Sequence, residues 1–296
     1  PFDEQKIDSQ RFRHWLGTDK LGRDVAAGMV AGTRVAMLVG VIAMSVAAFI
    51  GILLGGLAGY FGDQRLKVKR VQIVFALLGF VLAIFYAFLS RAYVLQEAGD
   101  AFFMELMKSM GIFLLVLFAF LAIGWGLSKL PFLNKNVRFP MDLIVMRIIE
   151  IFNSIPAILL ILAVVAIIQK PSVFYIMLII GLIRWTGIAR FIRAELLKIR
   201  QLEYIEAARA MGFKEVRIFL RHAIPNALPP VLITIAFGIA GAILVEASLS
   251  FLGIGVSSDT VSWGSMLQIA RNNFSAWWLA IFPGSAIFVT VTVFNL

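Results

Sequence analysis

The stretch VAMLVGVIAMSVAAFIGILLGGLAGYFG, residues 35–62, contains no Asp, Glu, Lys or Arg. It is longer than the ~20 apolar residues that carry an α-helix across a bilayer. A helix at the surface of a soluble core would carry a polar face along such a length, and this segment has none. The stretch therefore predicts a membrane-spanning helix.

Further stretches without a charged side chain follow along the chain. They are residues 71–90, 109–128, 151–169, 223–245 and 272–296. A shorter one, residues 172–183, extends to residue 190 if Arg184 directs its guanidinium toward a headgroup layer. We therefore expect about seven spans and an all-α fold, a polytopic bundle of transmembrane helices.

The composition limits the function classes. Of 296 residues, 61% are hydrophobic and 15% are charged, whereas soluble domains carry roughly 25% charged residues. The chain has no cysteine and two widely separated histidines, so we expect no metal site and no catalytic residues. The net charge of +10 is typical of basic cytoplasmic loops beside membrane lipid, and no nucleic-acid partner is expected.

The basic residues mark alternate loops. Residues 63–70, 129–142 and 190–221 are each rich in Lys and Arg, which predicts that they are cytoplasmic. Residues 1–34 would then form an external N-terminal segment with an interface element, ahead of a membrane domain at residues 35–296. Because the chain begins with Pro and its last span stops at Leu296, we expect it to be clipped at both ends.

The cytoplasmic loop at residues 190–225 contains two short amphipathic segments. QLEYIEAARAM, residues 201–211, suits a short helix, and Gly212 suits a left-handed C-terminal cap. Its small residues, Ala207, Ala208 and Ala210, would let another backbone approach closely. A second helix, apolar at Val216, Phe219, Leu220 and Ala223, is expected to lie flat on the membrane surface and to end at Pro225.

This loop resembles a known element. Glu206-Ala207-Ala208, then Gly212, then HAIPN at residues 222–226 resemble the EAA loop of ABC-importer permeases. In that family the loop forms a coupling helix that sits in a groove of the cytoplasmic ATPase. The resemblance assigns ATPase coupling to Glu206, Ala207, Ala208, Gly212 and Pro225.

Other motifs are similar to the C-type permease of dipeptide, oligopeptide and nickel importers, in the family's order. They are HWLGTD at 14–19 with LGRD at 21–24, MR at 146–147 with Glu150 and SIP at 154–156, RWTG at 184–187 with AR at 189–190, EASLSFLGIG at 246–255, SWGSML at 262–267, and WLAIFPG at 278–284. Glu150 stands where Asp is usual. The match covers about residues 14–62 and 140–296.

The resemblance implies a type I ABC-importer permease fold in the bacterial cytoplasmic (inner) membrane. Such a subunit is not an enzyme; with a second permease it forms a path for peptides, nickel or other small solutes. Two ATP-binding cassette subunits and an extracytoplasmic substrate-binding protein are the implied partners. The chain has no G-x-x-x-x-G-K-[S/T] loop, so we expect no cofactor of its own and ATP bound by the partner subunits.

Residues from about 70 to 139 have no recognisable counterpart in the usual subunit. They contain an insertion of two spans, an extra helical hairpin at residues 71–128. Because both spans lack charge and are rich in Phe, Leu and Ile, we expect the hairpin at the lipid-facing periphery, outside the transport path. The alternative is that it replaces a missing first span in wrapping the partner permease.

Two residues are candidates for the translocation path or its gate. Glu246 is a carboxylate in an apolar run, which is costly in a membrane and often functional; it would line a cavity or cap the external end of its span. Pro156 is expected to kink its helix.

Other residues have structural interpretations. Arg147 and Glu150 are spaced for an intrahelical pair, and Pro229-Pro230 suit the first turn of a span. The tryptophans Trp15, Trp263, Trp277 and Trp278 are expected at the outer interface. A rival function, an ion-coupled secondary transporter, would need internal repeats and more intramembrane acidic residues than Glu246.

Overall fold

The computed structural model describes residues 14–98, 101–130, 132, 135–167, 172–254, 260–273 and 275–296. The chain divides into two compact units, residues 1–60 with 145–296 as the first and residues 61–144 as the second. Each is described by itself.

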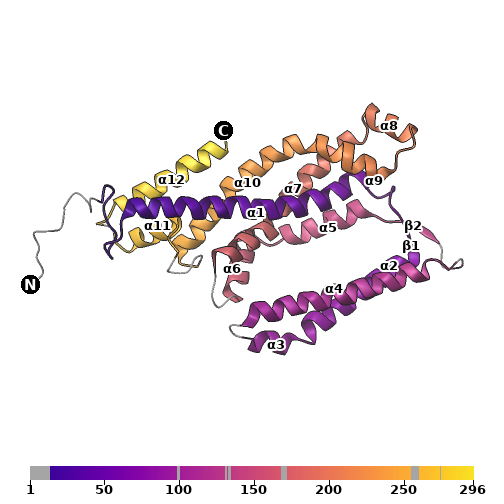
Figure 1. The fold of residues 1–296 in the computed structure, drawn as a ribbon, viewed down its shortest axis with the longest axis horizontal. Coiled ribbons are helices and arrows are strands. Elements are labelled where there is room, and N and C mark those ends of the chain that lie inside the picture. The colour runs from indigo at the N-terminus through magenta and orange to yellow at the C-terminus, as the bar shows by residue number, and fades with distance from the viewer. Residues whose placement is uncertain are drawn as a thin grey trace, which may run out of the picture. The chain divides into compact units, whose positions relative to one another are not determined.

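The described elements are almost all helical, as Figure 1 shows. In chain order they are α1 (Val25–Phe61), β1 (Lys67–Lys69), α2 (Arg70–Ile84), the π-helical turn η2 (Phe85–Leu89), α3 (Ala92–Glu97), α4 (Phe102–Leu127), β2 (Asn136–Arg138), α5 (Met141–Asn153), α6 (Ala157–Ile167), α7 (Val173–Ile199), α8 (Glu203–Ala210), α9 (Glu215–Ile218), the π-helical turn η5 (Phe219–Ala223), α10 (Ile224–Leu252), α11 (Trp263–Arg271) and α12 (Trp278–Phe294). β1 and β2 pair antiparallel with Val68 opposite Val137. The expected all-α class is confirmed.

Several of these helices are apolar and long enough to cross a membrane. Among the described residues, five meet that criterion, and the bent pair α5–α6 makes a sixth if it is counted as one span. α12 is shorter but equally apolar. Five or six of the about seven predicted spans are therefore confirmed, and the last one coincides with the shorter helix α12.

The first span begins earlier than its charge-free stretch. α1 starts at Val25, so Arg34 lies inside the helix. The carboxylate of Asp24 accepts a 2.8 Å hydrogen bond from the N–H of Ala26, which caps the first turn. A charge at the end of a span does not end its helix.

The expected span at residues 151–169 is not one helix. α5 ends at Asn153, α6 begins at Ala157, and their axes differ by 74°. Pro156 lies in this break, so the predicted kink in this span is confirmed. The predicted intrahelical pair is present in α5, with Arg147 Nη1 2.6 Å from Glu150 Oε2.

Glycines let α1 and α7 of the first unit touch backbone to backbone. A Cβ at Gly55 would stand 2.2 Å from the carbonyl oxygen of Ala189, and one at Gly59 2.6 Å from that of Arg193. Small residues four apart are the usual means of close helix approach in membranes. An apolar core between α1, α6, α7 and α10 adjoins this contact: Val39, Ala43, Ile161, Val165, Ile176, Met177, Ile179, Ile180, Ala242 and Leu249.

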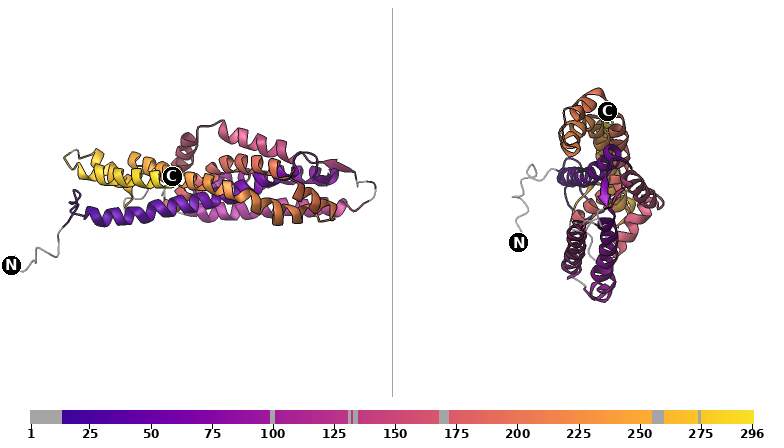
Figure 2. Two further views of the ribbon diagram at one scale, coloured as in Figure 1. Left: turned by 90° about the horizontal axis from the view of Figure 1, so that it is seen from above. Right: turned by 90° about the vertical axis from the view of Figure 1, so that its right-hand side faces the viewer.

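In the second unit α2 and α4 lie side by side (Figure 2). A Cβ at Gly79 would meet the Cβ of Phe120 at 2.5 Å, and the rings of Phe75 and Phe120 are 6.3 Å apart. Many of the large apolar side chains of this pair point outward, among them Leu77, Val81, Leu115 and Phe118. The pair therefore presents an apolar surface.

Candidate functional site: a coupling helix and its contacts

The short helix α8 ends in a complete glycine cap. Gly212 has φ +79°, its N–H donates to the carbonyl of Arg209 at 2.8 Å, and the N–H of Phe213 donates to the carbonyl of Ala208 at 3.2 Å. These two bonds define a Schellman motif, in which glycine is favoured because it has no Cβ to clash at positive φ. The predicted helix and its cap are confirmed.

The two faces of α8 differ. Glu206, Ala207 and Ala210 are exposed together with Glu203, whereas Ile205 is buried. Ala208, which was grouped with Ala207 as a surface for another subunit, is 4% exposed and packs against its own chain. A 100° step per residue separates these neighbours, so only Ala207 belongs to the open face.

An ion-pair cluster ties α8 to α1 and α9. Glu215 accepts from Arg209 Nε at 2.8 Å on one carboxylate oxygen and from the Tyr60 hydroxyl at 2.7 Å on the other. The Tyr60 ring, fully buried, also lies 5.2 Å from the ring of Phe219 in η5. Arg200, just after α7, donates to the carbonyl of Gly59 at 3.2 Å. We call Tyr60, Arg209 and Glu215 the clamp.

The contacts of Arg209 favour its charged form. Burial by itself lowers the pKa of Arg209, but the hydrogen bonds and charge of Tyr60 and Glu215 outweigh it, so the pKa is raised. Arg209 is therefore a permanent cation at the root of α8. Its Nη2 is buried, with no hydrogen-bond partner among the described residues.

The segment after Gly212 differs from expectation. α9, η5 and α10 run on as one helical stretch from Glu215 to Leu252, so Pro225 does not end a separate surface helix. It lies in the first turn of α10, directly after the π-helical turn, where its missing N–H is tolerated. The predicted apolar face is also split, because Phe219 and Ala223 are buried while Val216 and Leu220 are exposed.

Pro229 and Pro230 also lie deeper than predicted. They are the sixth and seventh residues of α10, inside the helix and not in its first turn. α10 begins at Ile224 because η5 already continues the helix from the cytoplasmic loop. The charge-free stretch at residues 223–245 begins one residue before α10, so it already indicated this start.

Glu246 belongs to α10, and its carboxylate faces α11 and not an open space. It is 1% exposed, it accepts a 2.7 Å hydrogen bond from the hydroxyl of Ser250, and it is also bonded by Ser262. Ser262 is the N-cap of α11 and accepts from the N–H of Ser265 at 3.2 Å. The carboxylate thus joins two helices, and cavity lining is not what this structure presents.

The motif at residues 14–24 folds as a tight turn over the start of α1. The carboxylate of Asp19 accepts from the N–H of Leu21, the N–H of Arg23 and the Nε of Arg23, all within 2.7–2.9 Å. Burial raises the pKa of Asp19, but these bonds from Arg23 and Leu21 prevail and hold it below its usual value. His14 Nδ1 lies 3.3 Å from Asp24 Oδ2.

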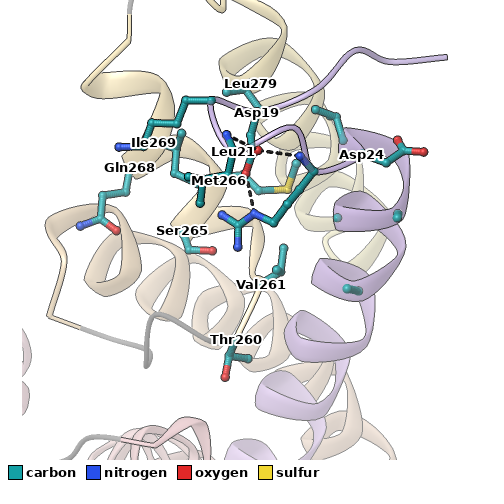
Figure 3. A pocket seen from close by; sticks show the side chains of 16 residues that line it. Asp19, Leu21, Asp24, Thr260, Val261, Ser265, Met266, Gln268, Ile269 and Leu279 are labelled. Atoms are coloured by element: carbon teal, nitrogen blue, oxygen red, sulfur yellow. Dashed lines mark hydrogen bonds and ion pairs between the residues drawn. The ribbon is translucent and has the colours of Figure 1, made fainter. Parts of the chain in front are cut away.

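This turn borders a cavity of about 510 Å³ that Figure 3 shows. One wall is the beginning of α1, and the other is α11 with Val261 and Met266. Two tryptophans fix the walls: Trp278 Nε1 donates to the carbonyl of Thr18, and Trp263 Nε1 to that of Met29, each at 3.1 Å. Trp263 is 3% exposed, so its expected place at the lipid interface was wrong.

Comparison with known proteins identifies the family. The profile of the "Binding-protein-dependent transport system inner membrane component" matches residues 122–296. The chain belongs to this family. This permease is therefore a multi-pass protein of the inner membrane, not an enzyme, and the resemblance to ABC-importer permeases is confirmed. The ion-coupled alternative has no support.

Its relatives are named as permeases for peptides. It is 28% identical to the "Probable D,D-dipeptide transport system permease protein DdpC" of Escherichia coli, over 96% of this chain and 70% of the relative. It is 30% identical to the "Glutathione transport system permease protein GsiD" of Pectobacterium atrosepticum, over 96% of this chain and 69% of the relative. A "Dipeptide transport system permease protein DppC" of Alkalihalophilus pseudofirmus is 28% identical, over 98% of this chain and 71% of the relative.

The sequence alone did not reveal the clamp of this permease. Tyr60 stands at the end of an apolar run, Arg209 counts as one more loop cation, and Glu215 as one more acid of a surface helix. Their association depends on a contact across 155 positions, which no local period records. The one available signal was a hydroxyl at the end of a span.

Proposed function

We propose that this permease is one half of the transmembrane path of an ATP-driven peptide importer, and that α8 couples it to the ATPases. The other half would be a second permease subunit. Peptides are favoured because the relatives are named for dipeptides, D,D-dipeptides and glutathione. Nickel and other small solutes are the alternative cargo for this kind of permease.

The observation that carries the coupling proposal is the division of α8 into two faces. One face is open and carries the small side chains of Ala207 and Ala210 together with Glu203 and Glu206, and it would enter a groove on an ATP-binding cassette subunit. The other is fixed to its own chain by Ile205, Ala208 and Arg209. Two such cassette subunits would bind the ATP, so the permease would need no cofactor.

Movement of α8 would reach the spans through the clamp. The carboxylate of Glu215 accepts hydrogen bonds from Arg209 of α8 and from Tyr60 at the end of α1. Glu215 also begins the continuous helical stretch that becomes α10. A displaced α8 would therefore move α1 and α10 together, as a rigid-body switch between outward-open and inward-open states requires.

The remaining site residues have places in this scheme. Pro156 would act at the 74° break between α5 and α6, a point where a span can change its bend. Glu246 would act on the gate through α11, because its carboxylate is hydrogen-bonded by Ser262, the N-cap of that helix. The α2–α4 hairpin would stay at the lipid-facing periphery, and an extracytoplasmic substrate-binding protein would deliver the peptide.

Affinity purification of the permease, expressed with its neighbouring genes, tests the proposal. We expect the permease to bring down an ATPase and a second permease. The reconstituted complex should take up di- to penta-alanine only when ATP is present on the side of the membrane where the ATP-binding cassette subunits lie. Uptake by the purified permease alone, driven by an ion gradient, would contradict it.

A further inference from the structure

Arg184 places a guanidinium in the middle of a span. It is the twelfth residue of α7, which begins at Val173, so it lies about 17 Å along the axis at ~1.5 Å per residue. The hydrocarbon layer is about 30 Å thick. The side chain is exposed on the first unit, and no described residue forms a hydrogen bond or ion pair with it.

The sequence alone left open that the Arg184 side chain extends toward a headgroup layer. In the structure it lies instead against the middle of α10. A Cβ built on Gly241 would meet Arg184 Nη2 at 3.3 Å, and its Cζ and Nη1 at 3.5 Å. Gly241 precedes the end of α10 by eleven residues, just as Arg184 follows the start of α7 by eleven. The guanidinium therefore rests against a neighbouring helix, beside the position of Gly241.

The surface beside the guanidinium is open. Gly187, three residues on and thus on the same face of α7, has no atom within 4 Å of the place where its Cβ would be. Behind this face, the core of α7 and α10 is apolar. A mid-span cation is costly toward lipid tails and marks a solute path or a paired site.

We propose that Arg184 binds the free C-terminal carboxylate of the transported peptide, at mid-depth in the path. The planar fork of arginine matches a carboxylate with two parallel hydrogen bonds. Gly241 lets the fork lie against α10, and the open space at Gly187 would admit the backbone of the solute. This assignment rests on the proposed function, because it presumes that the cargo is a peptide.

The test uses the complete reconstituted transporter and a mixture of di- to penta-alanine as the probe. Arg184→Gln should lower uptake at limiting peptide by about tenfold or more, the scale of a lost charge-assisted hydrogen bond. ATP hydrolysis stimulated by the loaded binding protein should persist. Removing a charge from a span eases insertion, so loss of uptake would not report misfolding. Arg34→Gln, which removes an exposed arginine of α1, should leave uptake unchanged.

Two further variants separate the fork from its charge. Arg184→Lys should retain more uptake than Arg184→Gln but less than the wild type, since a lysine cannot bind bidentately. Gly241→Leu should displace the guanidinium and reduce uptake, with no additional loss when combined with Arg184→Gln.

Three results would overturn the assignment. Wild-type uptake by Arg184→Gln would leave the peptide importer standing and remove the site. Loss of the second permease from the Arg184→Gln complex would place the carboxylate on that subunit instead of the solute. A wild-type complex that hydrolyses ATP but imports none of the peptides would overturn both the peptide cargo and its carboxylate site.

Discussion

The hydroxyl of Tyr60 donates a 2.7 Å hydrogen bond to Oε2 of Glu215, across 155 positions of the chain. Tyr60 lies in the last turn of α1, and Glu215 begins α9. The second oxygen of the same carboxylate accepts from Arg209 of α8. One carboxylate thus connects the exposed helix with the first span.

Removing the hydroxyl tests this connection. Tyr60→Phe keeps the buried ring against Phe219 but takes away the donor, which should cost about 1 kcal/mol of stability. ATP hydrolysis by the assembled transporter should remain while peptide imported per ATP falls. Tyr93→Phe, at an exposed tyrosine of α3, is the control. An unchanged ratio of import to hydrolysis in Tyr60→Phe would show that the bond transmits nothing.

The Arg209–Glu215 pair can be tested by a double-mutant cycle. Arg209→Gln and Glu215→Gln should each lower the melting temperature of the purified complex, and the double variant should lose less than the sum. The expected interaction is about 1 kcal/mol, because Glu215 is partly exposed and solvent screens the pair. Additive losses would mean that the two side chains do not depend on each other.

The cap at Gly212 should respond to backbone conformation alone. A Cβ there meets no atom within 4 Å, so Gly212→Val should be penalised only by its positive φ, by roughly 1–2 kcal/mol. Gly212→Asn should be milder, since Asn tolerates this region. We expect peptide uptake in the order wild type, Asn, Val, with Gly126→Ala in α4 as the control. Equal uptake by all four proteins would rule out a role for the cap.

The sequence could predict those features of the fold that depend on residues close together in the chain. Charge-free runs indicated the spans, and a glycine after a short helix indicated its left-handed cap, because both signals lie within a few residues. The i, i+3 spacing of Arg147 and Glu150 likewise indicated their intrahelical pair, which lies on an exposed face of α5.

Features set by packing were not predictable. Ala207 and Ala208 are the same residue type in one motif. Only the way α8 is rotated as it packs on the rest of the chain buries Ala208 and leaves Ala207 exposed. Trp263 was predicted to be an interface anchor. Instead, Gly32 leaves space beside its indole, and the carbonyl of Met29 accepts a hydrogen bond from the indole N–H. Such partners lie more than 200 positions away in sequence.

The peripheral place proposed for the α2–α4 hairpin can be tested with one cysteine, because the chain has none of its own. Leu115 is exposed on α4. Leu115→Cys should not react with a hydrophilic thiol reagent in the assembled transporter, whether idle or transporting, because lipid tails exclude the reagent. Leu21→Cys, at an exposed residue of the N-terminal turn, should react. Labelling of Leu115→Cys during transport would place the hairpin on an aqueous path.

The most direct test of coupling through α8 compares two adjacent alanines. Ala207→Cys and Ala208→Cys, each carrying a thiol-linked benzophenone, would be irradiated in the assembled transporter and examined for a covalent product with the ATPase. Ala207 is on the open face and Ala208 is 4% exposed, so we predict a strong product from Ala207→Cys and little or none from Ala208→Cys. No product with the ATPase from Ala207→Cys, in a complex that still hydrolyses ATP, would contradict the assignment of α8 as the coupling helix.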